Sequence, residues 1–175
     1  MKNKTIWSNR FKNKTSQSFL KIGSSIHIDK RLYEQDIAAS IVHTQMLIKQ
    51  KIIKREVGNK IINGLKKIKS QIDKGKFEFK VKFEDIHLNI EKALFGIIGP
   101  SAGFLHTARS RNDQVVTDFK LWIKEASKET LKTISLVMKS LIKKAEKNID
   151  TVMPGMTHLK NGQPISFAHY LLSYF

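Results

Sequence analysis

The sequence predicts an all-α protein, and three observations lead to this fold class. From about residue 112 to 148 the chain contains no Gly or Pro, and mostly apolar residues recur every three or four positions, as on one face of a helix. Residues 29–51 and 55–74 repeat this spacing. Only residues 74–83 alternate apolar and basic side chains as a strand does, and a single strand has no partner, so we expect an extended connector there.

Residues 1–110 are predicted to form a small N-terminal helical domain that opens with an extended arm through about residue 24. Asp29 is the expected N-cap of the first long helix. The second helix, at 55–74, contains Gly58 and Gly64, which are unusual inside a helix, and ends at Gly75. Its inward face is expected to comprise Val57, Ile61, Leu65, Ile68 and Ile72.

A third helix is predicted to begin at Glu84 and Asp85, because acidic side chains suit the positive end of the helix dipole. Its inward face is expected to comprise Ile86, Ile90, Leu94 and Ile97. Four further residues then break the chain before the next helix, namely Gly96, Gly99, Pro100 and Gly103.

Residues 111–175 are predicted to be the beginning of a central helical-bundle domain. A helix of about 35 residues is roughly 50 Å long, longer than a compact domain of this size is wide, so it needs a bundle around it. Its inward face is expected to comprise Phe119, Ile123, Ala126, Thr130, Ile134, Val137, Leu141 and Ala145. A turn is expected at Met153 to Gly155, and Pro164 is expected to begin a last helix over 165–175. That helix is still apolar at Phe175, which suggests an incomplete bundle.

Composition narrows the class of protein. The 175 residues are 41% apolar, enough for a core, and the absence of Cys excludes disulfides and thiolate metal ligands. A polar N-terminal segment and the lack of any run of about 18 apolar residues predict a cytoplasmic protein without a membrane partner. The net charge of +17 would suit nucleic acid, but the lysines are spread over every predicted helix, which favours a solvated basic surface and no nucleic-acid partner. A basic module that binds nucleic acid or protein stays the alternative.

The segment LHTARSRNDQ, residues 105–114, concentrates polar chemistry just before the longest predicted helix. A helix that starts near Asn112 or Asp113 leaves its first N–H groups unpaired and favours an anion beside them. Arg109 and Arg111 add forked donors that suit carboxylates or phosphates. The alternative is a polar loop in which Arg109 pairs with Asp113 and Ser110 or Asn112 caps the helix.

Four segments in order resemble the argininosuccinate lyase family, within the superfamily of fumarase, aspartase and adenylosuccinate lyase. They are SSIHIDKRLYEQDIAAS at 24–40, EDIHLNIE at 84–91, HTARSRNDQV at 106–115 and PGMTHLKNGQP at 154–164. The resemblance implies a β-elimination that splits argininosuccinate into arginine and fumarate, the last step of arginine biosynthesis, without metal or organic cofactor. It also implies a homotetramer whose sites each combine segments of three subunits. Adenylosuccinate lyase or a fumarase is the nearest alternative.

The resemblance also implies roles for individual residues. His158 matches the family's catalytic acid/base histidine, while Thr157, Asn112 and Ser25 match substrate-binding residues. Asp85 and His87 of the EDIH motif are expected near the substrate, and Ser110 and Arg111 are weaker candidates that shape the loop. From the residues alone, a His after a turn is more often a surface or capping residue, and the other candidates could instead be turn residues, caps or a buried polar pair. The remaining histidines show no paired metal-ligand spacing, so no metal is assigned.

The chain departs from the family pattern at several places. WSNRF, residues 7–11, stands where WGGRF is usual, Phe104 where Lys or Arg is common, and Lys160 and Gly162 where Gln and Ala are usual. The family's GSSxMPxKxNP loop, with a second catalytic residue, a Ser, and a substrate-binding Lys, is missing. We therefore expect an N-terminal fragment that is inactive unless the rest is supplied.

Overall fold

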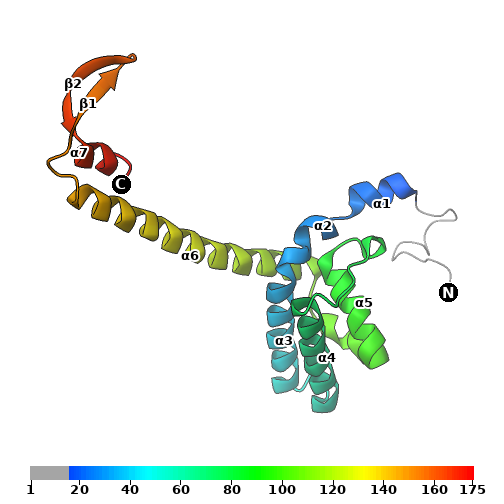
Figure 1. Cartoon of the computed structure of the whole chain (residues 1–175). Coiled ribbons are helices and arrows are strands. Elements are labelled where there is room, and N and C mark those ends of the chain that lie inside the picture. Colours follow the sequence, from blue (N-terminus) through cyan, green and yellow to red (C-terminus); the bar gives the residue numbers. More distant parts are fainter. Residues whose placement is uncertain (1–15) are drawn as a thin grey trace. The chain divides into compact units, whose positions relative to one another are not determined.

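The computed structural model describes residues 16–175 and has the predominantly helical architecture that the sequence predicts (Figure 1). The chain divides into two compact units, Met1–Trp122 and Ile123–Phe175. The first contains α1 (Gln17–Gly23), α2 (Ile26–Asp29), η1 (Lys30–Leu32), α3 (Tyr33–Lys49), α4 (Arg55–Asp73), η2 (Val81–Phe83), α5 (Ile86–Ile98) and η3 (Gly99–His106). α6 (Arg111–Glu146) runs from the first unit into the second, which continues with β1 (Val152–Thr157), β2 (Lys160–Ser166) and α7 (Phe167–Leu172).

The predicted extended arm is helical where the structure describes it. Ser16 caps α1, because its side-chain oxygen accepts a hydrogen bond of 3.1 Å from the N–H of Phe19. The arm prediction is therefore wrong for residues 17–23. The departures from the family pattern at Ser8 and Asn9 lie outside the described residues.

Helices α3, α4 and α5 enclose the core of the first unit (Figure 1). The predicted face of α4 is confirmed, since Ile61, Leu65 and Ile68 are completely buried. Gly58 and Gly64 fit this packing: a Cβ at Gly58 would collide with Ile48 of α3, and one at Gly64 with Leu94 of α5. The two glycines therefore let α3 and α5 approach α4. The prediction for α5 is wrong at Ile97, which is 38% exposed.

Asp29 caps a different helix from the one predicted. The chain passes through α2 and η1 before α3 begins at Tyr33. The Oδ1 atom of Asp29 accepts a hydrogen bond of 3.1 Å from the N–H of Ile86, the first residue of α5. The carboxylate thus satisfies an unpaired N–H group of a helix 57 positions further along the chain.

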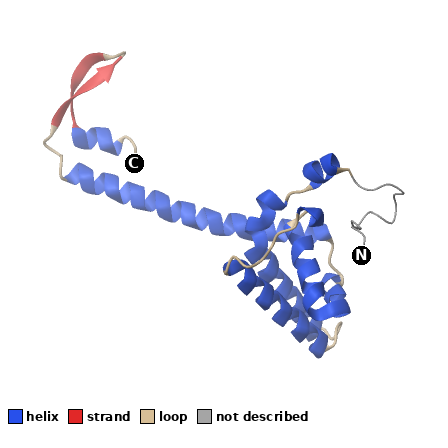
Figure 2. Cartoon of the chain, turned by 45° about the vertical axis from the view of Figure 1, so that its right-hand side comes forward, coloured by secondary structure: helices blue, strands red, loops and turns tan. Residues whose placement is uncertain are grey.

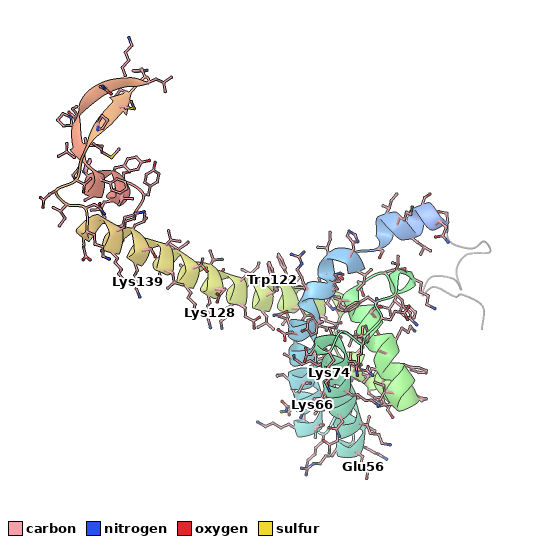
Figure 3. The ribbon with its side chains drawn as sticks, in the orientation of Figure 1. Glu56, Lys66, Lys74, Trp122, Lys128 and Lys139 are labelled. Carbon is pink, nitrogen blue, oxygen red and sulfur yellow. The ribbon has the colours of Figure 1, made fainter. Side chains whose placement is uncertain are left out.

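The long helix predicted for residues 112–148 is confirmed as α6. Lys128 and Lys139 project from it, while Lys66 and Lys74 belong to the α4 region, so basic side chains are spread over separate helices (Figure 3). The predicted inward face of α6 is largely exposed in the structure, at Phe119, Ile123, Ile134 and Val137. Near its end, Ala145 packs with Ala168 and Leu171 of α7. Within residues 16–175, no helix has the length and apolar character needed to cross a membrane.

The second unit contains an antiparallel hairpin that the sequence did not predict (Figure 2). β1 and β2 pair so that Pro154 lies opposite Pro164, at positions predicted to be a turn and a helix start. Both predictions are wrong, because each strand of a two-stranded ribbon is an edge strand, and an edge strand tolerates Pro. α7 begins only at Phe167, with Ser166 as its cap.

Candidate functional site

The SSIH and EDIH segments meet at one backbone carbonyl group. The carbonyl oxygen of Glu84 accepts hydrogen bonds from the N–H of Ser25 at 2.9 Å, the N–H of Ile26 at 3.0 Å and the hydroxyl of Ser24 at 3.0 Å. Glu84 has a φ of 60°, a conformation that non-glycine residues adopt rarely. The start of α2 is thereby held against the start of α5.

Ser25 and Asp85, two predicted substrate contacts, lie at this junction. Asp85 caps α5, since its Oδ1 atom accepts a hydrogen bond of 2.6 Å from the N–H of Leu88. The hydroxyl of Ser25 donates to Oδ2 of Asp29 at 2.6 Å. Burial raises the pKa of Asp29, and the hydrogen bond from Ser25 opposes that rise. The Ser25 hydroxyl of the SSIH segment and the Asp85 carboxylate of the EDIH segment therefore lie at the same junction in the first unit.

The SRND segment forms the start of α6. The Oδ2 atom of Asp113 accepts from the N–H of Ser110 at 3.0 Å, and the hydroxyl of Ser110 accepts from the N–H of Asn112 at 3.2 Å. The predicted alternative pairing of Arg109 with Asp113 is wrong, because Nη1 of Arg109 donates to the hydroxyl of Ser40 at 3.2 Å. The side chain of Asn112 is exposed on the first turn. It is thus accessible to a ligand.

Arg111 at the start of α6 and His106 of η3 both contact Glu91 of α5. Nη2 of Arg111 lies 3.5 Å from Oε2 of Glu91, and Nη1 of Arg111 donates to Gln114 at 3.1 Å. The same Glu91 oxygen is 3.0 Å from Nε2 of His106. The hydrogen bond with His106 lowers the pKa of Glu91, although burial opposes this. Arg111 is therefore engaged within the protein, in keeping with a loop-shaping residue.

Thr157 and His158 lie at the tip of the hairpin in the second unit. His158 and Leu159 are the central residues of a two-residue turn, with φ of 52° and 61°, and Thr157 pairs with Lys160 across it. Positive φ at both central residues is typical of a type I′ turn, which usually contains Asn and Gly. A backbone conformation that is costly for His and Leu is often found at functional sites. The side chains of Thr157, His158 and Leu159 are all exposed.

The first unit contains the predicted residues Ser25, Asp85, His87, Ser110, Arg111 and Asn112, with Ser25 and Asp85 at the Glu84 junction and Ser110, Arg111 and Asn112 at the start of α6. Thr157 and His158 belong to the second unit. His87 differs from the others, because it is only 3% exposed and faces two carboxylates in the core, those of Asp36 and Asp118.

Three buried polar residues of the first unit were not predicted from the sequence, namely Asp36, Gln114 and Asp118. Nε2 of Gln114 donates to Oδ1 of Asp36 at 2.5 Å and so ties α6 to α3. The spacing of polar residues in the sequence could have indicated these positions. Polar residues recur every four positions on α3 and again on α6, at Asp36, Ser40 and Thr44 and at Gln114 and Asp118.

Comparisons with known proteins show which family the chain resembles. A family model described as Lyase matches residues 9–175. An argininosuccinate lyase from Pelagibacter ubique is 57% identical over 172 residues, 98% of this chain and 37% of that protein. One from Ehrlichia chaffeensis is 49% identical over 175 residues, 100% of this chain and 37% of that protein. The chain thus spans about 37% of the length of these curated relatives.

Solved structures share the fold. A variant of EDDS lyase with bound fumarate superposes with a TM-score of 0.70 at 24% identity, covering 93% of this chain and 32% of that one. A fumarate lyase from Mesorhizobium sp. BNC1 superposes with a TM-score of 0.64 at 16% identity, covering 93% and 38%. With the four motifs in order and a family model that matches nearly all of the sequence, the chain belongs to the lyase family.

Proposed function

We propose that this chain supplies part of the active site of an argininosuccinate lyase, which splits argininosuccinate into arginine and fumarate. One observation carries the proposal: Ser25 and Asp85, from segments 60 positions apart, lie together where the Glu84 carbonyl joins them. The argininosuccinate lyases that are 57% and 49% identical to it support this choice over another lyase. A homotetramer in the cytoplasm, without a nucleic-acid, membrane or cofactor partner, completes the proposal.

The reaction needs fixed donors for a carboxylate that gains negative charge. Removal of a proton from the carbon beside that carboxylate places a second negative charge on it, and positioned hydrogen-bond donors stabilise such charge. The first turn of α6 offers the exposed side chain of Asn112 beside the positive end of a 36-residue helix. We assign Asn112, with Ser25 and Ser110, to substrate binding. Arg111 positions this turn through Glu91.

The reaction also needs a base and a group that assists the departing guanidino nitrogen. We assign the acid/base role to His158, because an imidazole exchanges protons near neutral pH and this side chain is exposed at a strained turn. Thr157 beside it is assigned to substrate binding. In a homotetramer the hairpin tip and the start of α6 of different subunits would combine in one site.

A chimaera tests the proposal. Residues 1–175 replace the matching stretch of the Pelagibacter ubique argininosuccinate lyase, and fumarate release from argininosuccinate is followed by ultraviolet absorbance. We expect activity, and His158→Asn should lower kcat by about 10²- to 10⁴-fold, the contribution of a general acid or base. Asn tolerates positive φ, so the turn should persist.

Lys160→Gln, at the end of the same turn, is the matched control and should retain activity. Absence of fumarate release from the unmodified chimaera would refute the proposed reaction. Near-normal kcat in His158→Asn would remove only the acid/base assignment.

A further inference from the structure

A group of four ionisable side chains lies inside the first unit, and the proposed chemistry does not use it. We name it the acid–histidine cluster, and it consists of Asp36 of α3, His87 of α5, Asp118 of α6 and Arg109, which precedes α6. Asp36 and Asp118 are completely buried and His87 is 3% exposed. Nδ1 of His87 lies 3.5 Å from Oδ2 of Asp36 and 3.5 Å from Oδ2 of Asp118. One imidazole therefore stands between carboxylates of two other helices.

Such a cluster is stable only if its charges balance. A buried charge without a partner is costly, and two carboxylates in one cavity repel each other. Arg109 supplies one positive charge, and a protonated His87 supplies the second. Among the described residues, both oxygens of Asp118 and Oδ2 of Asp36 have no conventional hydrogen-bond partner, so the imidazolium is the group nearest at hand to compensate them.

Electrostatics favour a proton on this cluster near neutral pH. Burial opposes the charge of His87, but the Asp36 carboxylate and the charges of Asp85 and Asp118 outweigh it and raise the pKa of His87 above 6.5. Burial, with the nearby charge of Asp36, raises the pKa of Asp118 to about 7. The charged groups that act on His87 are Asp36 of α3, Asp85 before α5 and Asp118 of α6, with Asp29 of α2 also close to it. Arg109 before α6 acts on the two carboxylates of Asp36 and Asp118.

A divalent cation is a poorer occupant than a proton. Asp36, His87 and Asp118 offer three ligand atoms within 4.8 Å of one another, as a metal site would. However, Arg109 already brings a positive charge to both carboxylates, and a dication added to it would leave the cavity with excess positive charge. With both carboxylates ionised, above the pKa of Asp118 of about 7, the imidazolium instead gives two negative and two positive charges.

We propose that His87 is a positioning residue: its imidazolium, held between Asp36 and Asp118, fixes the first turn of α5 against the first two turns of α6. The inference rests on the proposed function, since the start of α5 carries Asp85, expected near the substrate, and the start of α6 carries Asn112, assigned above to substrate binding. In this inference His87 holds the starts of α5 and α6 from within the core and does not contact the substrate.

The protonation state is tested on the 175-residue chain without any assay of activity. Nuclear magnetic resonance of histidine side chains labelled with nitrogen-15 should show that His87, assigned by its loss in His87→Gln, titrates above pH 6.5. Its contribution to stability is then present below pH 6.5 and lost as pH rises through its folded pKa. A His87 ring that is neutral at pH 6.5 would overturn the inference.

Zinc chloride and a chelator provide the test against a metal. Neither should change the Tm of the chain. A rise in Tm with zinc chloride that is absent from His87→Gln would identify a metal site in place of the proton.

The positioning role is tested in the chimaera with a compensating pair. His87→Gln leaves the two carboxylates with one cation, and a displacement of about 1 Å at the substrate turns should lower kcat/KM about a hundredfold. Adding Asp118→Asn restores the balance between Asp36 and Arg109, so the double variant should recover most of the lost Tm and kcat/KM. If His87 contacted the substrate, the double variant would recover Tm but stay as inactive as His87→Gln. Failure of the proposed function is distinguishable, because the unmodified chimaera would then release no fumarate while the titration of His87 stays as expected.

Discussion

Gly64 of α4 faces Leu94 of α5, and Gly64→Ala should destabilise the first unit. A Cβ at this position would lie 2.5 Å from Cδ1 of Leu94 and 3.4 Å from Cγ2 of Ile98. Leu94 is completely buried, so its side chain has no space into which it could turn. Because α5 begins at the EDIH turn, the substitution also tests how this turn is placed.

The change in the free energy of unfolding on Gly64→Ala follows from two opposing effects. An extra methyl group in a packed core costs about 1–3 kcal/mol. Replacing Gly by Ala inside a helix contributes roughly 0.5–1 kcal/mol in the other direction. Gly96 of α5 isolates the second effect, because nothing lies within 4 Å of a Cβ built there. Gly96→Ala should therefore stabilise the chain, and the two variants should differ by about 1–3 kcal/mol.

Urea unfolding followed by circular dichroism measures both free energies of unfolding under the same conditions. Leu94→Ala provides a double-mutant cycle, since it should be less destabilising in the Gly64→Ala background than alone. If Gly64→Ala proved as stable as Gly96→Ala, the close approach of α4 and α5 would be refuted.

Three further predictions concern the site and its surroundings. Asp85→Ala should cost about 1 kcal/mol of stability by removing the cap on Leu88, whereas Asp85→Asn should keep stability in urea unfolding and lower only the chimaera's activity. The lowered pKa of Glu91 stabilises the fold above pH 4.5 and this contribution is lost as pH falls through the folded pKa, so Glu91→Gln should flatten the acid side of a stability profile; an unchanged profile would contradict the His106 contact. Duplex DNA should bind weakly in a fluorescence anisotropy titration, and a steep negative dependence on salt would instead favour the basic binding module.

The helices that the sequence predicted best are those with strong periodicity and local end signals. α4 has a continuous apolar row and ends just before Gly75, and α6 has no internal Gly or Pro. Their boundaries follow from local chemistry, so no knowledge of the tertiary structure was needed. The same local reasoning could not explain Gly58 and Gly64, because their purpose is the approach of neighbouring helices.

Features that depend on remote contacts were not predicted. Asp29 has the composition of a cap for the helix that follows it, yet its carboxylate accepts from Ile86, and only the folded chain brings these residues together. The hairpin was missed because Pro154 and Pro164 are typical of turns and helix starts. The acid–histidine cluster was missed because sequence spacing does not reveal which polar faces of three helices will meet.

The motifs indicate the predicted substrate residues but not their accessibility. The motifs identified Ser25 and Asp85, and the Glu84 junction gives a physical reason for their proximity. His87 carried the same motif signal, but its burial separates it from the exposed side chain of Asn112. A motif indicates which residues matter, while accessibility decides which of them can touch a ligand.

The Glu84 junction has a consequence for how this protein tolerates mutation. The acceptor is a main-chain oxygen, so exchanging the side chain at position 84 does not delete it. Of its three donors, only the hydroxyl of Ser24 belongs to a side chain. Position 84 should instead discriminate among substitutions by torsional preference, accepting Gly at φ 60° and ψ −61° and rejecting Val or Ile. The link between the SSIH and EDIH segments thus depends on the backbone conformation at position 84. A comparison of side chains alone would not detect it.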